Sequence, residues 1–342
     1  MEHIGIDLGG KESQICVRSD QGEILEEARC PAGLVTEFLA RRAPGRIAFE
    51  TRTEAFKMAD LVKGQGHDVR VVSATLVRSL GVGRRKLKND VRDARVLSEA
   101  SCRIDLPSVH IPTTASREVK ALCTSREALV KARTQMVARI RSYLRSRIRK
   151  PLRAIPESLP GKVRDALLQD PEGLPLHVER LLVVIESLND QIKSADAELK
   201  ELAGNDERTR RLMTVPGVGP ATAARYVATI DDVDRFPNAS YVASYLGLTP
   251  GENTTGFKTR RTRLTRAGAP QVRWALGQAA WSLYLRRPQD PMAQWARRVA
   301  ERRGVQIAIT ALARKLSQVL YAMWKTKTNC SPLHALAPAV TH

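Results

Sequence analysis

The sequence predicts an N-terminal α/β domain, a mixed sheet flanked by helices, followed by two all-α or mostly helical parts. Three observations predict this: short apolar runs alternate with helical segments in residues 3–100, heptad spacing follows, and long apolar helical segments close the chain. A chain of 342 residues has room for two or three domains of roughly 100–200 residues each. We therefore expect domains at residues 1–108, 109–208 and 209–330.

The first domain contains the strand signals. Strands are expected at residues 3–8, 13–18, 23–29, 46–49 and 68–72, with a turn at 19–22. Helices are expected at residues 34–42, 54–63 and 90–103, with Asn89 as the N-cap of the last. Strands that first form a meander and then alternate with helices are typical of a mixed sheet.

The middle of the chain carries two segments with heptad spacing. Apolar residues recur every seven positions, at Leu122, Leu129, Met136 and Tyr143 and again at Ile185, Ile192 and Leu199. Prolines at positions 151, 156, 160, 171 and 175 predict an irregular connector between the two segments. The pattern predicts an antiparallel coiled-coil arm; a dimer seam and a helical hairpin within one domain are the alternatives.

The charge balance indicates a polyanionic partner. The chain has 56 Lys and Arg against 36 Asp and Glu, a net charge of +20. No apolar run reaches the roughly 18–20 residues of a membrane span, and the N-terminus does not resemble a signal peptide. Nucleic acid is therefore expected rather than a membrane. Five scattered cysteines without a C-x-x-C pair predict neither a zinc site nor a disulfide framework and fit the reducing cytoplasm.

Four acidic residues form the first candidate site. Asp7 and Glu50 each end an expected strand, and Asp90 and Asp93 share one face of an expected helix. Four carboxylates that converge on one spot repel one another, and divalent cations relieve that repulsion. Mg²⁺ suits an all-oxygen site, and two metal ions can stabilise both the attacking and the leaving oxygen of a phosphodiester. Taken singly, each acid also fits a turn former or a helix N-terminal charge.

A glycine turn and a basic segment form the second candidate region. Gly217 and Gly219 precede an apolar helix at residues 221–230 and resemble a helix-hairpin-helix element, whose backbone N–H groups bind phosphate. An ordinary packing turn is the alternative. No acid occurs between Glu252 and Asp290, whereas eight Lys and Arg do. An unbalanced stretch of this length is expected to contact phosphates.

The residues expected to contact nucleic acid lie in three basic segments. These are the loop residues Arg84, Arg85, Lys86 and Lys88, the arm residues Arg139, Arg141 and Arg145, and the C-terminal residues Lys258, Arg260, Arg261, Arg263 and Arg266. Thr255 lies just before the last segment, so its hydroxyl is a candidate nucleophile toward phosphorus.

Six short motifs occur in the order seen in one family. They are Ile-Gly-Ile-Asp at residues 4–7, Ala-Phe-Glu-Thr at 48–51, Lys-Asn-Asp-Val-Arg-Asp-Ala-Arg at 88–95, Val-Pro-Gly-Val-Gly at 215–219, Leu-Gly-Leu-Thr-Pro at 246–250 and Arg-Ala-Gly at 266–268. In these motifs the chain resembles the DEDD transposases of the insertion sequence 110 family, with its 1111 subgroup. The resemblance extends from Ile4 to about Lys325.

The resemblance implies a RuvC-like, ribonuclease-H-type domain, then a coiled-coil arm, then a transposase domain. It implies that Asp7, Glu50, Asp90 and Asp93 are the catalytic tetrad and that the chain recombines donor and target DNA. It also implies a structured noncoding guide RNA and a homo-oligomer, a dimer or tetramer, in which the tetrad of one protomer meets the transposase domain of another. Where the family usually has a catalytic serine before a glycine, this chain has Thr255 before Gly256.

Threonine keeps the hydroxyl, but its β-branch restricts χ1 and crowds an in-line attack. Three alternatives remain: Thr255 is the nucleophile, this copy is impaired, or Thr254 or Ser244 substitutes. The prediction is a Mg²⁺-dependent DNA transposase. A RuvC-type nuclease without a covalent intermediate and a non-catalytic nucleic-acid-binding protein are the rival hypotheses.

Overall fold

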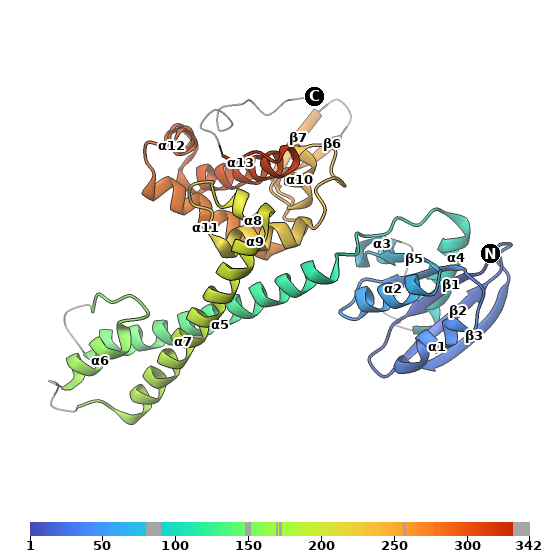
Figure 1. Ribbon diagram of the computed structural model, residues 1–342, viewed down its shortest axis with the longest axis horizontal. Coiled ribbons are helices and arrows are strands. Elements are labelled where there is room, and N and C mark those ends of the chain that lie inside the picture. Colours follow the sequence, from blue (N-terminus) through green and yellow to red (C-terminus); the bar gives the residue numbers. More distant parts are fainter. Residues whose placement is uncertain (80–89, 148–151, 169, 171–172, 256–257, 331–342) are drawn as a thin grey trace. The chain divides into compact units, whose positions relative to one another are not determined.

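The computed structural model describes residues 1–79, 90–147, 152–168, 170, 173–255 and 258–330 (Figure 1). At residues 90, 253–255 and 258–261 the description covers the backbone alone. The chain divides into two units, Met1–Pro112 and Thr113–His342. The helical arm and the C-terminal part thus lie in one unit by this criterion, and the three-domain division stays a prediction.

The first unit is built on a five-stranded mixed sheet with strand order β3-β2-β1-β4-β5. Its strands are β1 (His3–Asp7), β2 (Glu12–Arg18), β3 (Ile24–Pro31), β4 (Arg46–Glu50) and β5 (Asp68–Val72). The first three strands pair antiparallel, whereas β1, β4 and β5 run parallel. The predicted mixed sheet is confirmed, and this architecture is consistent with a RuvC-like fold.

Helices cover both faces of this sheet. The helices of the unit are η1 (Ala32–Leu34), α1 (Val35–Ala40), α2 (Ala55–Gly64), α3 (Ala74–Ser79) and α4 (Asp90–Arg103). Ile4, Ile6 and Phe49 pack with α1 and α2 on one face. Ala48 packs with Leu97 and Ala100 of α4 on the other face. Because side chains alternate along a strand, neighbouring residues of β1 and β4 belong to opposite layers.

The second unit begins with a long helical hairpin. Helices α5 (Thr114–Arg147) and α7 (Leu176–Asn205) pack against each other, with α6 (Leu159–Leu168) between them in sequence. Contacts pair Cys123 with Leu199 and Arg126 with Asp196, and the segment around Ile140 with Leu182, so the helices run antiparallel. The hairpin within one chain is therefore observed, and knobs-into-holes coiled-coil packing stays a prediction.

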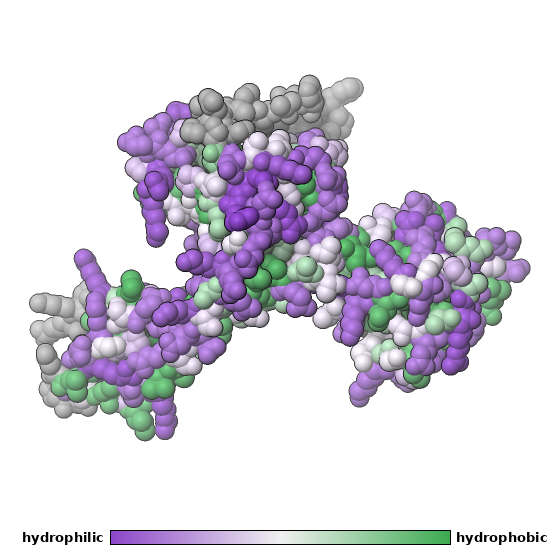
Figure 2. Space-filling model, viewed as in Figure 1, coloured by the Kyte–Doolittle hydropathy of each residue, from purple (hydrophilic) through white to green (hydrophobic). Residues whose placement is uncertain are grey.

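The predicted irregular connector was partly wrong, because α6 forms inside it. Its apolar residues Leu159, Val163 and Leu167 are fully buried against α5 and α7. Arg164 binds Glu179 of α7 with its Nη2 2.6 Å from Oε1 and also pairs with Glu186. Pro160 lies in the first turn, where proline leaves no helical hydrogen bond unmade. At this end of the hairpin, apolar Ile155, Leu168 and Leu176 are exposed, and Figure 2 shows hydrophobic atoms there.

The rest of the second unit is mostly helical, as predicted. Its helices are α8 (Glu207–Leu212), α9 (Pro220–Ile230), α10 (Ala239–Tyr245), α11 (Pro270–Arg286), α12 (Pro291–Arg303) and α13 (Val305–Thr326). One apolar core joins them and includes the fully buried residues Tyr226 and Leu316. An antiparallel hairpin of β6 (Pro250–Thr255) and β7 (Lys258–Leu264) was not predicted and follows α10.

Candidate active site

The first unit brings Asp7 and Glu50 to the same edge of the sheet. Strands β1 and β4 are parallel neighbours, with Ile6 opposite Phe49. The next residue of each strand is Asp7 and Glu50, the last residue of its strand. Ends of parallel strands are where such sheets carry ligands.

Alternation places both acids on the face that α4 covers. His3 and Gly5 of β1 contact α4, and Ala48 of β4 does so too. Asp7 and Glu50 follow these residues by two positions, which returns each to the same face of the sheet. Asp7 is 6% exposed and Glu50 is half-buried.

Helix α4 runs antiparallel to β1 and so directs its first turn toward this edge. His3 Nδ1 lies 2.9 Å from Ser101 Oγ. Nearer the end of β1, a Cβ on Gly5 would overlap the carbonyl oxygen of Ala94. Because the helix numbers fall as the strand numbers rise, the residues just before Ala94 lie toward the end of β1. Asp93 is half-buried there, and Asp90 begins the helix, although its side chain lies outside the description.

Arg52 binds the buried carboxylate of this edge. Its Nη2 lies 2.8 Å from Asp7 Oδ1, and its Nη1 donates to the carbonyl oxygen of Leu8 at 2.5 Å. Arg52 follows Glu50 by two residues, so the connector after β4 holds the end of β1. Arg52 was not predicted from the sequence, although the acid-rich strand ends beside it were a signal that a cation is needed.

The donor chemistry at this edge fits a hard divalent cation. Asp7, Glu50 and Asp93 offer carboxylate oxygens alone, the ligand type that Mg²⁺ and Mn²⁺ prefer. Among the described side chains, a set that leaves out Asp90, no three His, Cys, Asp or Glu lie close enough together to hold a metal ion. The edge therefore collects the right ligand type, and assembly of the full tetrad stays a prediction.

Thr255 lies at the far end of the β6–β7 hairpin. In the strand register it pairs with Lys258. The side chains of Thr254, Thr255, Lys258, Arg260 and Arg261 lie outside the description. Arg263 and Arg266, nearer the base of the hairpin, are exposed. The structure thus places the candidate nucleophile on the same small element as the predicted phosphate-binding residues.

The other basic residues fall in two groups. Arg139, Arg141 and Arg145 of α5 are exposed. Arg141 and Arg145 donate hydrogen bonds to backbone carbonyl oxygens of Ala154 and Arg141. The residues Arg84, Arg85, Lys86 and Lys88 lie outside the described part of the chain.

The glycine turn before α9 has two different glycines. Gly217 has φ +87, and a Cβ there would lie 2.6 Å from the carbonyl oxygen of Ala279 in α11. This position therefore requires glycine for packing. Gly219 caps α9, and nothing lies within 4 Å of a Cβ built there. Binding of phosphate at this turn stays a prediction.

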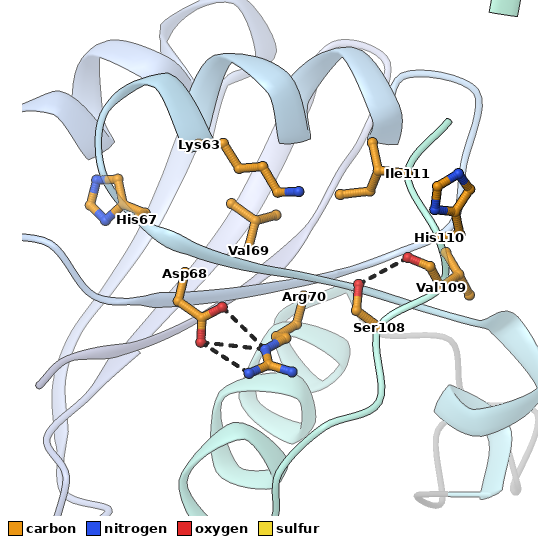
Figure 3. Close-up of a pocket in the computed structure, with 9 residues that line it drawn as sticks. All are labelled: Lys63, His67, Asp68, Val69, Arg70, Ser108, Val109, His110 and Ile111. Carbon is orange, nitrogen blue, oxygen red and sulfur yellow. Dashed lines mark hydrogen bonds and ion pairs between the residues drawn. The ribbon is translucent and has the colours of Figure 1, made fainter. Parts of the chain in front are cut away.

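A groove of about 500 Å³ lies beside the first residues of β5 (Figure 3). Val72, which pairs with Glu50, is at the other end of this strand. Its lining residues are Lys63, His67, Asp68, Val69, Arg70, Ser108, Val109, His110 and Ile111. Arg70 is paired with Asp68 at 3.2 Å, so part of its charge is neutralised within the groove. Asp7, Glu50 and Asp93 are not among the lining residues, so the groove is separate from the carboxylate edge.

Comparison with known proteins gives matches along most of the chain. A family model of DEDD insertion sequence 110 transposases matches residues 4–148, and the model of the transposase IS116/IS110/IS902 family matches residues 209–296. The transposase for insertion sequence element IS1328 of Yersinia enterocolitica is 28% identical over 94% of this chain and 96% of its own length. The transposase for insertion sequence element IS1111A of Coxiella burnetii is 26% identical over 94% and 88%.

The carboxylate edge and these matches define an enzyme that acts on DNA, a transposase. More narrowly, the chain belongs to the insertion sequence 110 family of DEDD transposases. Such a family implies dependence on a divalent metal in general. Within the described residues, no helix has the length and apolar character needed to cross a membrane.

Proposed function

We propose that this transposase cleaves and exchanges DNA strands of an insertion sequence in a Mg²⁺-dependent reaction, with Asp7, Glu50, Asp90 and Asp93 as the metal ligands. The observation that carries the proposal is the shared edge and face of Asp7 and Glu50, toward which α4 directs its first turn. Bound Mg²⁺ stabilises the charge that develops on the phosphate oxygens.

The chain's own residues hold this edge in place. Arg52 ties Asp7 and the carbonyl of Leu8 to the connector after β4. Gly5 lets α4 approach β1 closely enough for Asp93 to reach the same edge. The ligands are therefore carried by core elements, which keeps their positions fixed during the reaction.

Thr255 is the proposed nucleophile. Its Oγ forms a bond to a DNA phosphorus while a phosphodiester P–O bond breaks, the threonine proton passes to water, and the released DNA hydroxyl takes a proton from water. Attack by a DNA hydroxyl on the phosphothreonine reverses the step and restores Thr255. The basic residues Lys258, Arg260, Arg261, Arg263 and Arg266 neutralise phosphates beside it. Support comes from its place at the hairpin end and from the family resemblance.

The test is strand cleavage and exchange on DNA with the element ends, in Mg²⁺ and in EDTA. A protein–DNA adduct on denaturing gels is expected for the wild type and for Thr255→Ser, and its loss is expected for Thr255→Ala. Strand exchange that persists in Thr255→Ala favours the rival nuclease, which uses water and forms no covalent intermediate. Tight binding with no strand breakage under any metal condition favours the non-catalytic rival.

We further propose that a structured noncoding RNA guides the reaction and that the chain acts as a dimer or tetramer. The exposed arginines of α5, Arg139, Arg141 and Arg145, support contact with nucleic acid. Apolar side chains exposed at the far end of the helical hairpin support contact between chains. Reactions with and without the element's noncoding transcript, and the mass measured by light scattering, test these two proposals.

A further inference from the structure

Two connectors lie against each other at the base of the β6–β7 hairpin. Residues 246–249 lead from α10 into β6, and residues 265–269 lead from β7 into α11. Gly247 has φ +67, and a Cβ there would overlap the backbone of Ala267. Gly268 has φ +72, and a Cβ there would overlap the carbonyl oxygen of Tyr245. Gly247 thus lets the second connector lie against the first, and Gly268 lets the second connector lie against the end of α10.

One arginine side chain joins the two connectors. Arg273, in the first turn of α11, donates from Nη1 to Leu246 O at 3.1 Å, to Ala267 O at 2.6 Å and to Gly268 O at 3.0 Å. One acceptor belongs to the connector that enters the hairpin, and two belong to the connector that leaves it. A charged donor to several carbonyl oxygens makes stronger hydrogen bonds than a neutral one.

The hairpin beyond this point depends on its base. Thr265 N donates to Thr249 O at 3.0 Å, so a backbone hydrogen bond joins the two connectors where they meet the strands. The strand register shifts between Pro250 and Glu252, so the pairing is irregular just above the base. Strand β7 is polar along most of its length, and a two-stranded hairpin without an apolar face is marginally stable by itself.

We propose that Arg273 is a positioning residue that locks the base of the β6–β7 hairpin and thereby sets the place of Thr255 at its far end. The inference rests on the proposed role of Thr255. Arg273 acts through backbone carbonyls and touches no reacting atom, so its loss displaces the nucleophile without removing it. A displacement of about 1 Å can cost about 10²-fold in rate.

The surroundings of Arg273 fit a guanidinium fixed in place. Burial, with repulsion from Arg266 as the smaller cause, lowers the pKa of Arg273 from its ordinary value. It nevertheless stays charged at neutral pH, as arginine does in proteins. Lysine carries three N–H donors on one nitrogen, so Arg273→Lys is expected to keep most of the lock, whereas Arg273→Gln loses the charge.

The experiment compares the full-length wild type with Arg273→Gln, Arg273→Lys and a matched control, Arg303→Gln, at the exposed arginine that ends α12. Three quantities are measured: DNA affinity, the cleavage rate at saturating DNA, and hydrogen exchange at the amides of Gly247, Leu248 and Thr265. Arg273→Gln is expected to lower the cleavage rate about 10²-fold and to speed exchange at these amides, with little change in DNA affinity. Arg273→Lys should retain both properties, and Arg303→Gln should match the wild type.

Two results would overturn the proposal. One is a loss of DNA affinity in Arg273→Gln with an unchanged rate at saturating DNA, because that result makes Arg273 a phosphate contact. The other is a folded Arg273→Lys with wild-type amide protection and a 10²-fold slower reaction, because the lock would then be intact and irrelevant. If Thr255→Ala retains strand exchange, the nucleophile assignment fails, whereas amide protection in Arg273→Gln still reports on the lock. If Arg273→Gln does not fold, Arg273→Lys decides between the same outcomes.

Discussion

The carboxylate edge of the first unit and the hairpin of the second unit are held in opposite ways. Asp7 and Glu50 each follow a fully buried residue, Ile6 in β1 and Phe49 in β4. Arg52, in the connector after β4, binds Asp7. Thr255 ends a two-stranded hairpin whose described anchoring contacts lie at its base, around Gly247, Gly268 and Arg273. The proposed metal ligands thus sit on core elements, and the proposed nucleophile sits on an element whose described side chains are half-buried or exposed.

Because the two regions are held differently, variants at the hairpin base separate effects on the reaction from effects on the folding of the first unit. A substitution at the carboxylate edge changes charge inside a packed layer, so it affects both the reaction and the stability of the first unit. A substitution at the hairpin base leaves the first unit untouched and changes where the hairpin lies.

The largest effect is expected for Asp7→Asn. The amide has nearly the same shape, but it removes the charge that Arg52 and a metal ion need. Strand cleavage at saturating Mg²⁺ should fall about 10³-fold. Unfolding free energy, measured by denaturant titration, should fall by about 1–3 kcal/mol because Arg52 loses its partner. Cleavage at the wild-type rate in a folded Asp7→Asn would remove Asp7 from the reaction.

A pair of glycine variants sharpens the contrast between the units. Gly5→Ala forces β1 and α4 apart, because the new Cβ overlaps the backbone of Ala94, and should destabilise the first unit by about 3 kcal/mol. Gly247→Ala forces the two connectors apart and should slow cleavage while the first unit keeps its stability. Gly10→Ala and Gly277→Ala, where nothing lies within 4 Å of the Cβ, are the matched controls.

Calorimetry and cleavage assays on the same samples check these variants. If Gly247→Ala destabilises the first unit as much as Gly5→Ala does, the two regions are not held independently and the contrast between them is wrong. Loss of activity in either control would also contradict the contrast. Gly277→Ala in α11 should leave the stability unchanged or raise it by up to about 1 kcal/mol.

The smallest effect per residue is expected on the arm. Replacing Arg139, Arg141 and Arg145 by Gln removes three exposed charges without changing buried contacts. Nucleic-acid affinity should fall, and the slope of log affinity against log salt should become shallower by about one unit per lost phosphate contact. Filter binding across a salt series measures both quantities. An unchanged slope would show that the arm does not contact phosphates.

The sheet was predictable because its signals are local. Apolar runs, the turn after β2 and the strand-end acids gave the strands and placed Asp7 and Glu50 at their ends. That Asp7 and Glu50 share one face follows from the pairing register of β1 and β4. The structure was needed to show that Gly5 and Ala48, two positions earlier, contact α4. Long-range register is not written in any single segment, and Arg52 was missed for that reason.

Helix α6 and strand β7 were not predicted, because their local sequences favour another structure or none. Prolines suggested a loop where α6 forms, yet Pro160 lies in a first turn and Val163 and Leu167 are buried against the hairpin. Strand β7 reads Lys-Thr-Arg-Arg-Thr-Arg-Leu, which has no apolar alternation. Its pairing with β6 was therefore not predictable from its own sequence.

The most direct test of the account is the binding of Mn²⁺, a spectroscopic substitute for Mg²⁺, to the folded protein. Titration followed by electron paramagnetic resonance should find one or two bound ions per wild-type chain, and Asp7→Asn and Asp93→Asn should each weaken that binding at least about tenfold. Glu54→Gln, an exposed acid just beyond the carboxylate edge, should bind as the wild type does. Equal binding by all four proteins would contradict a metal site built from Asp7 and Asp93.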